Sequence, residues 1–429
     1  MRICRWCWLV VCLLGVPVRL TAQAGAADSA LPLTLADARR EALARDPMLA
    51  QLKAEREAAV QRARQTAFLD APMLEGQIWQ WPVNTPNPAN ADMYMLSVSQ
   101  EFPGRGKRAL RAAVLQTDVA AIGARIESRT RELDLDVRAA YLGLAAARGA
   151  LDIQTSAVPL LRQAVAASEA RYELGSSSQS DVLAGAVLVS KMSGELIELD
   201  EAHQLARARL NTLMLREPAA PIGPLDDLLE PPSLLTLAEL ERLALAHHPD
   251  LAEAGAMSAR ATAMANEARG DLKADVRVSG GFMFRPREGD AWLATVGFTW
   301  PKAPWARGKV DSRVAEADAE VEAAAAREQA ATAAIKHDVY ENYVMANAAR
   351  RRAELLRLTI LPQARQAISS ATTAYQTDKA DFQTVLAEQQ MLIESQLAYV
   401  RAVSDSARAI AELERVVGTT VTVQPDFTK

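Results

Sequence analysis

Residues 109–151 read ALRAAVLQTDVAAIGARIESRTRELDLDVRAAYLGLAAARGAL, and this stretch decides the fold. Apolar or small side chains recur in it at alternating spacings of three and four residues, with only two polar members. The positions are Ala109, Ala112, Gln116, Val119, Gly123, Ile126, Thr130, Leu133, Val137, Ala140, Leu144, Ala147 and Leu151. This spacing is typical of a helix that packs along a partner helix in a coiled coil. A helix from Arg105 to Ala157 would be roughly 80 Å long, which is far longer than an ordinary globular core requires.

The chain carries this organisation twice, at an offset of about 202 residues. The sequence LTLA at 33–36 recurs at 235–238, and Asp136 recurs as Asp338. A nearly constant offset over this distance indicates an internal duplication. The boundaries that we expect are residues 28–217 for the first repeat, 218–234 for a proline-rich linker, 235–418 for the second repeat and 419–429 for a C-terminal tail.

Each repeat is expected to contain a long antiparallel helical hairpin. Proline lacks the backbone N–H and collides with the preceding helical turn, so Pro159 and Pro362 are expected to break or kink the first arm of each hairpin. After a tight turn, return helices are expected over about residues 179–216 and 381–417. The second of these again carries apolar residues at a spacing of four and three.

A segment of alternating residues precedes the long helix of each repeat. In the second repeat, Val276, Val278 and Phe282 alternate with polar or charged residues, and another alternating run follows. Runs of about ten residues with one apolar face are typical of a transmembrane β-hairpin. We therefore expect hairpins at about residues 73–102 and 274–300, which gives four strands per chain.

Beyond the first 27 residues, every tryptophan lies in or beside these strands. The five are Trp79, Trp81, Trp292, Trp300 and Trp305. This bias suits an aromatic girdle at the bilayer interfaces, whereas the alternative is a soluble hairpin that buries one face against helices. Four strands cannot close a barrel, and an open edge in lipid would leave costly unpaired backbone groups. Closure therefore requires other copies of the chain, and this reasoning leaves their number open at two, three or more.

The first 27 residues have the pattern of a secretory signal peptide. Arg2 and Arg5 precede the apolar run Trp6–Val16, and small residues follow as far as Ala27. All three cysteines of the chain lie inside this segment, so the mature protein is expected to hold no disulfide. The net charge of −5 and the lack of a clustered basic excess argue against a nucleic-acid partner.

Three further stretches accompany the duplicated LTL start and the two hairpins. They are FPGRGKR at 102–108, Tyr172-x-x-Gly175 followed by 180–183, and Glu412 to Glu414 before Gly418. In this order and spacing they resemble TolC-like outer-membrane efflux proteins along nearly the whole mature chain. The resemblance implies an α+β fold and a homotrimer, in which helical hairpins form an α-barrel tunnel and the strands form one transmembrane β-barrel shared among protomers. It also implies a cell outer membrane location with a periplasmic helical tunnel, and as partners outer-membrane lipid, a periplasmic adaptor protein and an inner-membrane transporter.

The basic cluster Gly104–Arg108 is similar to the branch of this family that serves heavy-metal efflux through RND-type transporters. That similarity implies an exit duct that passes heavy-metal cations from the periplasm to the exterior. Drug efflux and type I protein secretion use the same fold and stay open as alternatives. A rival from another class is a periplasmic coiled-coil scaffold without a pore, which should lack the paired amphipathic strands.

No catalytic constellation is present, so we expect neither an enzyme nor a bound cofactor. Gly104–Lys107 does not fit a phosphate loop, because Arg108 stands where that motif requires serine or threonine. His247 and His248 are adjacent, but further ligands at a workable spacing are missing from the sequence around them. We interpret the pair as polar residues at a helix bend and expect no metal site.

The turns at the far ends of the two hairpins are the candidate functional site. Because they lie farthest from the strands, we expect them to form the periplasmic tip that meets the adaptor. The adaptor-contact candidates are Glu173, Leu174, Gly175, Ser176, Thr377, Asp378 and Lys379. Glycine permits close approach of a partner's backbone, so a bulky residue at Gly175 should impair assembly. Asp378 replaces this glycine in the second turn, where that feature is not expected.

Asp181, Asp381 and Tyr375 are the candidates for a periplasmic gate. Threefold symmetry would gather three copies of Asp181 into one ring and three copies of Asp381 into another. Carboxylates brought close together resist joint ionisation, so some of them should titrate above the ordinary pKa of about 3.9. A carboxylate ring attracts cations and can be blocked by multivalent ones. The alternative is that Asp181 caps the return helix at its positive N-terminal end.

Overall fold

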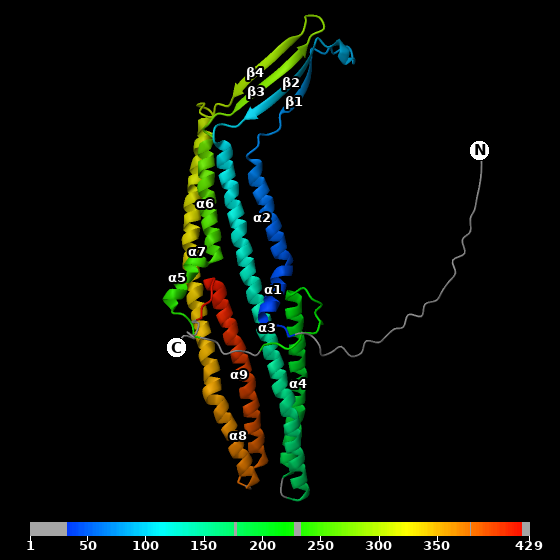
Figure 1. Ribbon diagram of the computed structural model, residues 1–429, viewed down its shortest axis with the longest axis vertical. Coiled ribbons are helices and arrows are strands. Elements are labelled where there is room, and N and C mark those ends of the chain that lie inside the picture. The colour runs from blue at the N-terminus through cyan, green and yellow to red at the C-terminus, as the bar shows by residue number, and fades with distance from the viewer. Residues whose placement is uncertain (1–31, 176–177, 227–232, 378, 423–429) are drawn as a thin grey trace, which may run out of the picture.

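The computed structural model is an elongated molecule with a β-sheet at one end and two helical tips at the other (Figure 1). It describes residues 32–175, 178–226, 233–377 and 379–422. The expected signal peptide, part of the linker and most of the expected C-terminal tail lie outside these ranges. Within the described ranges, no helix combines the length and the apolar character needed to cross a membrane.

The four strands form one antiparallel sheet and not two separate hairpins. They are β1 (Met73–Trp79), β2 (Met93–Phe102), β3 (Val276–Phe284) and β4 (Ala291–Phe298), in the spatial order β1-β2-β3-β4. The pairing of β2 with β3 places Leu96 opposite Phe282 and joins the two halves of the chain. Among the described residues, β1 and β4 each pair on one side only, so they are the two open edges of the sheet.

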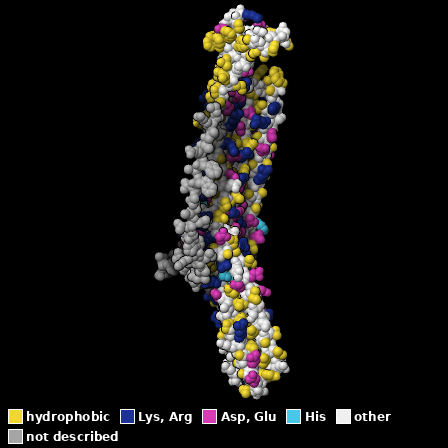
Figure 2. Space-filling model, turned by 90° about the vertical axis from the view of Figure 1, so that its right-hand side faces the viewer, with side chains coloured by type: hydrophobic (Ala, Val, Ile, Leu, Met, Phe, Trp, Pro, Cys, Tyr) yellow, Lys and Arg dark blue, Asp and Glu magenta, His cyan; other side chains and the backbone are white. Residues whose placement is uncertain are grey.

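Large apolar side chains of the sheet are uncovered. The exposed fractions are 83% for Trp292, 71% for Val296 and 74% for Phe298. Trp292 packs edge-on against Phe282 of the neighbouring strand, with 5.3 Å between ring centroids. Figure 2 shows hydrophobic side chains gathered over the sheet, with charged side chains spread along the helices below. A sheet that leaves aromatic rings outside suits lipid as its surroundings.

Two long hairpins descend from the sheet to the tips (Figure 1). The first consists of α3 (Lys107–Glu173) and α4 (Gln179–Leu213), and the second of α7 (Arg307–Leu355), the π-helical turn Leu356–Ile360, α8 (Leu361–Gln376) and α9 (Phe382–Val417). At 67 residues, α3 is roughly 100 Å long. Equivalent positions of the two repeats are buried in both hairpins. Val137 and Val339 are both fully buried, and so are Leu210 and Leu413.

The two prolines act differently, and the break that was one of the two outcomes expected at Pro159 is absent. Helix α3 continues without a break through Pro159, and the nearby residues Val158 and Leu161 are buried in the apolar core between the hairpins. Pro362 lies in the first turn of α8, where its missing N–H costs little. The π-helical turn directly before it interrupts the second hairpin, so only that hairpin changes its helical geometry near the proline.

Four shorter helices flank the long ones: α1 (Leu35–Arg45), α2 (Pro47–Gln65), α5 (Leu237–His247) and α6 (Pro249–Gly270). Asp46 caps α2 by accepting a hydrogen bond from the Leu49 N–H at 2.7 Å, and His248 caps α6 by accepting from the Asp250 N–H at 3.2 Å. Burial lowers the pKa of His248, which keeps its Nδ1 free to accept. His248 thus lies at the bend between α5 and α6.

The junction between sheet and helices uses the basic stretch after β2. Lys107 is buried, and its Nζ lies 2.9 Å from Oδ2 of Asp275, which directly precedes β3. The second Asp275 oxygen accepts from the Gly104 N–H at 2.7 Å. A side chain at Gly104 would come within 2.7 Å of the Ala274 carbonyl oxygen, so only glycine fits there. Gly104 and Lys107 of the basic cluster therefore bind Asp275 and connect the first repeat to the second.

Candidate gate and adaptor-contact tip

The first tip joins α3 to α4. Glu173 ends α3, and Leu174 after it is 83% exposed. Gly175 has a φ of +72°, which is the left-handed conformation that glycine adopts at little cost. A Cβ added to Gly175 would meet no heavy atom within 4 Å, so conformation rather than crowding favours glycine within this protomer. Ser176, the remaining candidate in this turn, lies outside the described residues.

The second tip joins α8 to α9. Thr377 follows the last residue of α8, and the Lys379 N–H donates to the Ala374 carbonyl oxygen at 2.8 Å to close the turn. Thr377 and Lys379 are both exposed. Asp378 between them lies outside the described residues. The described adaptor-contact candidates of both turns are thus at the same exposed end of the molecule (Figure 1).

Asp181 is part of a capping box and also reaches the other hairpin. Its N–H donates to the Ser178 hydroxyl at 3.2 Å, while its Oδ2 accepts from the Ser178 N–H at 3.3 Å. Its Oδ1 accepts from Nε2 of Gln383 in α9, also at 3.3 Å. The capping role is therefore present in the structure, and the same carboxylate links the starts of the two return helices.

Asp381 is the N-cap of α9. Its Oδ1 accepts from the Thr384 N–H at 2.8 Å and from the Thr384 hydroxyl. These hydrogen bonds hold the pKa of Asp381 below its ordinary value. Within one protomer the pKa of Asp381 is thus lowered, whereas a ring of carboxylates was expected to raise it.

Tyr375 lies between the two hairpins. Its ring packs under the Arg171 guanidinium, which is 4.6 Å from the ring centroid, and the Phe382 ring is 5.6 Å away. The Tyr375 hydroxyl is buried without a hydrogen-bond partner among the described residues. Tyr375 therefore contributes packing and a cation–π contact at this position, as the third of the three gate candidates.

Phe382 and Gly185 are functional candidates that the sequence reasoning missed. Phe382 begins α9 but is only 2% exposed, because its ring enters the first hairpin. A Cβ on Gly185 of α4 would lie 3.3 Å from Cε1 of Phe382 and 2.7 Å from Cγ2 of Val165. We call the packing of Phe382 against Gly185 and Val165 the tip contact. A phenylalanine directly after the gate candidate Asp381, far from the strands, was the available signal.

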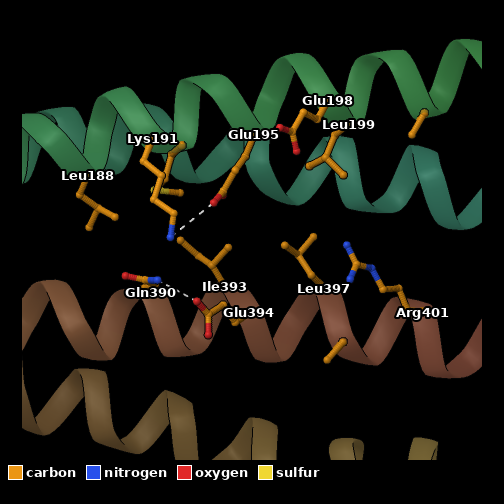
Figure 3. Close-up of a pocket in the computed structure, with 13 residues that line it drawn as sticks. Leu188, Lys191, Glu195, Glu198, Leu199, Gln390, Ile393, Glu394, Leu397 and Arg401 are labelled. Atoms are coloured by element: carbon orange, nitrogen blue, oxygen red, sulfur yellow. Dashed lines mark hydrogen bonds and ion pairs between the residues drawn. The ribbon is translucent and has the colours of Figure 1, made fainter.

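A groove separates α4 from α9 above the tip contact (Figure 3). It has a volume of about 530 Å³ and an apolar floor that includes Leu188, Ile393 and Leu397. Its rims are polar, with Lys191 3.7 Å from Glu195 on α4 and Gln390 donating to Glu394 at 2.8 Å on α9. An apolar floor with charged rims is suited to an amphipathic helix.

Asp181→Asn separates the capping role from the gate role. If a ring of Asp181 carboxylates attracts cations at the constriction, the variant should show weaker block by multivalent cations and a shifted pH dependence of conductance. The amide oxygen of asparagine can still accept from the Ser178 N–H, so the fold should lose little stability. Single-channel recordings on wild-type and variant channels measure this. Identical conductance and block in the two would leave Asp181 with the capping role alone.

One protein-family model matches both repeats of the chain. The family model described as "Outer membrane efflux protein" matches residues 38–214 and 240–419. No curated protein sequence matches the chain. The two matched segments together span most of the described residues and include both tips.

Solved structures share the fold over nearly the whole chain. The outer membrane protein VceC from Vibrio cholerae is 20% identical, with a TM-score of 0.74 over 90% of this chain and 96% of that one. CusC is 14% identical, with a TM-score of 0.76 over 94% and 97%. The open state of the outer membrane channel MtrE from Neisseria gonorrhoeae is 16% identical, with a TM-score of 0.75 over 91% of each chain. The predicted α+β fold of long helical hairpins and a four-stranded sheet is confirmed.

Proposed function

The chain belongs to the outer membrane efflux protein family, and from this premise we propose that three copies of it assemble into the exit duct of a tripartite efflux system. As a member of that family it is a transport channel of the outer membrane and not an enzyme. Its hairpins form the periplasmic part, and its sheet lies in the membrane.

The two open edges of the sheet are the observation that carries assembly from several copies, and the number three rests on the family resemblance. A four-stranded sheet in lipid leaves one row of unpaired groups on β1 and another on β4. Pairing β1 of one copy with β4 of the next removes both rows and closes the barrel without any change within the protomer. Native mass measurement of detergent-extracted protein tests the assembly, and a stable monomer would refute it.

The periplasmic partners that we propose are an adaptor protein at the tip and, through it, an inner-membrane transporter. The exposed residues Leu174, Gly175 and Lys379 support the tip as the contact, because they stand at the end of the molecule farthest from the sheet. The groove between α4 and α9 offers an apolar floor that continues this surface upward. Crosslinking from cysteine at Glu173 should capture the adaptor. Capture from strand positions alone would show that the helical tip is not the end that faces the adaptor.

Heavy-metal cations are the cargo that we propose. One support is the similarity of the cluster Gly104–Arg108 to the heavy-metal branch of the family. The other is the pair of carboxylates Asp181 and Asp381 at the tip, because carboxylates attract cations. Deletion of the gene should raise sensitivity to copper, silver, zinc, cobalt or cadmium. Hypersensitivity to lipophilic drugs alone would favour drug efflux, and loss of a secreted protein would favour type I secretion.

A further inference from the structure

Three potential metal ligands lie together on the exposed side of α7, far from the tip. His337 and Glu341 are exposed and Asp338 is half-buried, and one ligand atom from each lies within 4.8 Å of the other two. Nε2 of His337 is 3.6 Å from Oε2 of Glu341, one helical turn further along. Neither the barrel nor the gate uses this cluster.

We propose that His337, Asp338 and Glu341 bind one divalent cation of the zinc, cobalt or nickel class. Metal–ligand bonds of about 2.1 Å require ligand atoms about 3.0–3.4 Å apart, so small rotations of the side chains bring the three atoms to that spacing. One imidazole and two carboxylates are borderline and hard ligands, which favour these ions over the softer Cu⁺ or Ag⁺. Water completes the coordination, because the side chains of His337 and Glu341 are 73% and 55% exposed.

The backbone that carries the ligands is held rigidly by the core. Ile335 and Val339, which alternate with the ligands along α7, are 3% and 0% exposed, and they pack into the apolar cluster that includes Leu413. A ligand set on a well-packed helix keeps its spacing better than one on a loop. The Asn342 side chain also donates to the Asp338 carbonyl oxygen at 2.8 Å within this turn.

The duplication shows that the cluster is specific to the second repeat. At the offset of about 202 residues, Asp338 matches Asp136, but His337 matches Leu135 and Glu341 matches Ala139. The first repeat therefore keeps the aspartate and lacks the other two ligands. A purely structural need shared by both hairpins does not account for this difference.

Titration of the untagged, detergent-purified channel with Zn²⁺ tests the proposal. We expect one ion per protomer, with binding weakened by at least about tenfold in His337→Ala and in Glu341→Gln, because even loss of an outer-shell partner typically costs about 10- to 100-fold. His247→Ala is the matched control, since His247 is also exposed but belongs to no such cluster among the described residues. Circular dichroism and native mass show whether each variant keeps its fold and assembly.

Two outcomes would overturn the site. One is the absence of stoichiometric binding to the wild-type channel, and the other is equal affinity in wild type, His337→Ala and Glu341→Gln. The measurement uses no transport assay, so it is independent of the proposed cargo. If the channel binds Zn²⁺ here but deletion of its gene leaves metal sensitivity unchanged, the metal site is supported and the proposed cargo is wrong.

Discussion

Proline at Glu75 and proline at Gly76 should each lower the yield of assembled channel at least about tenfold. The two residues are adjacent in β1, opposite Ser97 and Leu96 of β2. Neighbouring backbone N–H groups of a strand point to opposite sides, so one of the two faces β2 and the other faces the open edge. In lipid each unpaired group costs several kcal/mol, and about 1.4 kcal/mol already equals a factor of ten. Native mass measurement of the detergent extract gives the fraction of assembled channel.

The comparison between the two variants tests edge pairing itself. If β1 pairs with β4 of a neighbouring copy, both prolines remove a hydrogen bond and both reduce assembly. If the β1 edge stays unpaired, only the proline that faces β2 does harm, and the other behaves as wild type. Proline at Val83, in the connection between β1 and β2, is the control for the residue type and should assemble normally, because Val83 is exposed and is the second residue of the turn Pro82–Thr85, where proline fits.

The alternation of apolar and polar residues predicted the strands well, because successive side chains of a strand point to opposite faces of the sheet. The alternating residues Val276, Val278 and Phe282 of the hairpin predicted at about 274–300 lie in the observed strand β3 (Val276–Phe284). What alternation could not reveal is the pairing of β2 with β3 across the two repeats. That contact joins strands about 180 residues apart in the sequence, and their order in the sheet depends on how the hairpins pack.

The heptad pattern predicted the middle of α3 correctly and the part nearer the sheet incorrectly. Leu133, Val137, Ala140 and Leu144 are buried as expected. Nearer the sheet the buried residues include Val114, Ala121 and Ala124, instead of the expected Ala112, Val119 and Gly123. There α3 packs against both α2 and α6, and two partner helices bury different faces from those that a single coiled-coil partner buries.

The turn residues of the candidate site could be predicted, but the contact that joins the hairpins could not. Asp181 and Asp381 follow turns, and the structure places both at the starts of return helices. The insertion of Phe382 beside Gly185 depends on the relative position of two hairpins. Periodicity within each helix contains no information on that position.

Phe382→Ala and Gly185→Ala should both loosen the tip, although by opposite means. Phe382→Ala leaves a cavity in the first hairpin and should weaken the tip contact by about 3–5 kcal/mol. Gly185→Ala places a Cβ 2.7 Å from Val165 Cγ2 on α3 and 3.3 Å from Phe382 Cε1 on α9, so it should crowd both helices at a cost of about 1–3 kcal/mol. Since about 1.4 kcal/mol equals a factor of ten, we expect the open probability of the channel to rise about tenfold or more in Phe382→Ala. Single-channel recording in planar bilayers measures it.

Gly194→Ala provides the control within the same helix. Gly194 also lies in the interior of α4, but a Cβ there meets no heavy atom within 4 Å. Replacing glycine by alanine inside a helix stabilises it by up to about 1 kcal/mol, and both glycine variants share this gain. Any difference between Gly185→Ala and Gly194→Ala therefore reports crowding at the tip contact alone. If Phe382→Ala and Gly185→Ala both conduct like Gly194→Ala, the tip contact does not hold the two hairpins together, and the gate must depend on contacts between protomers.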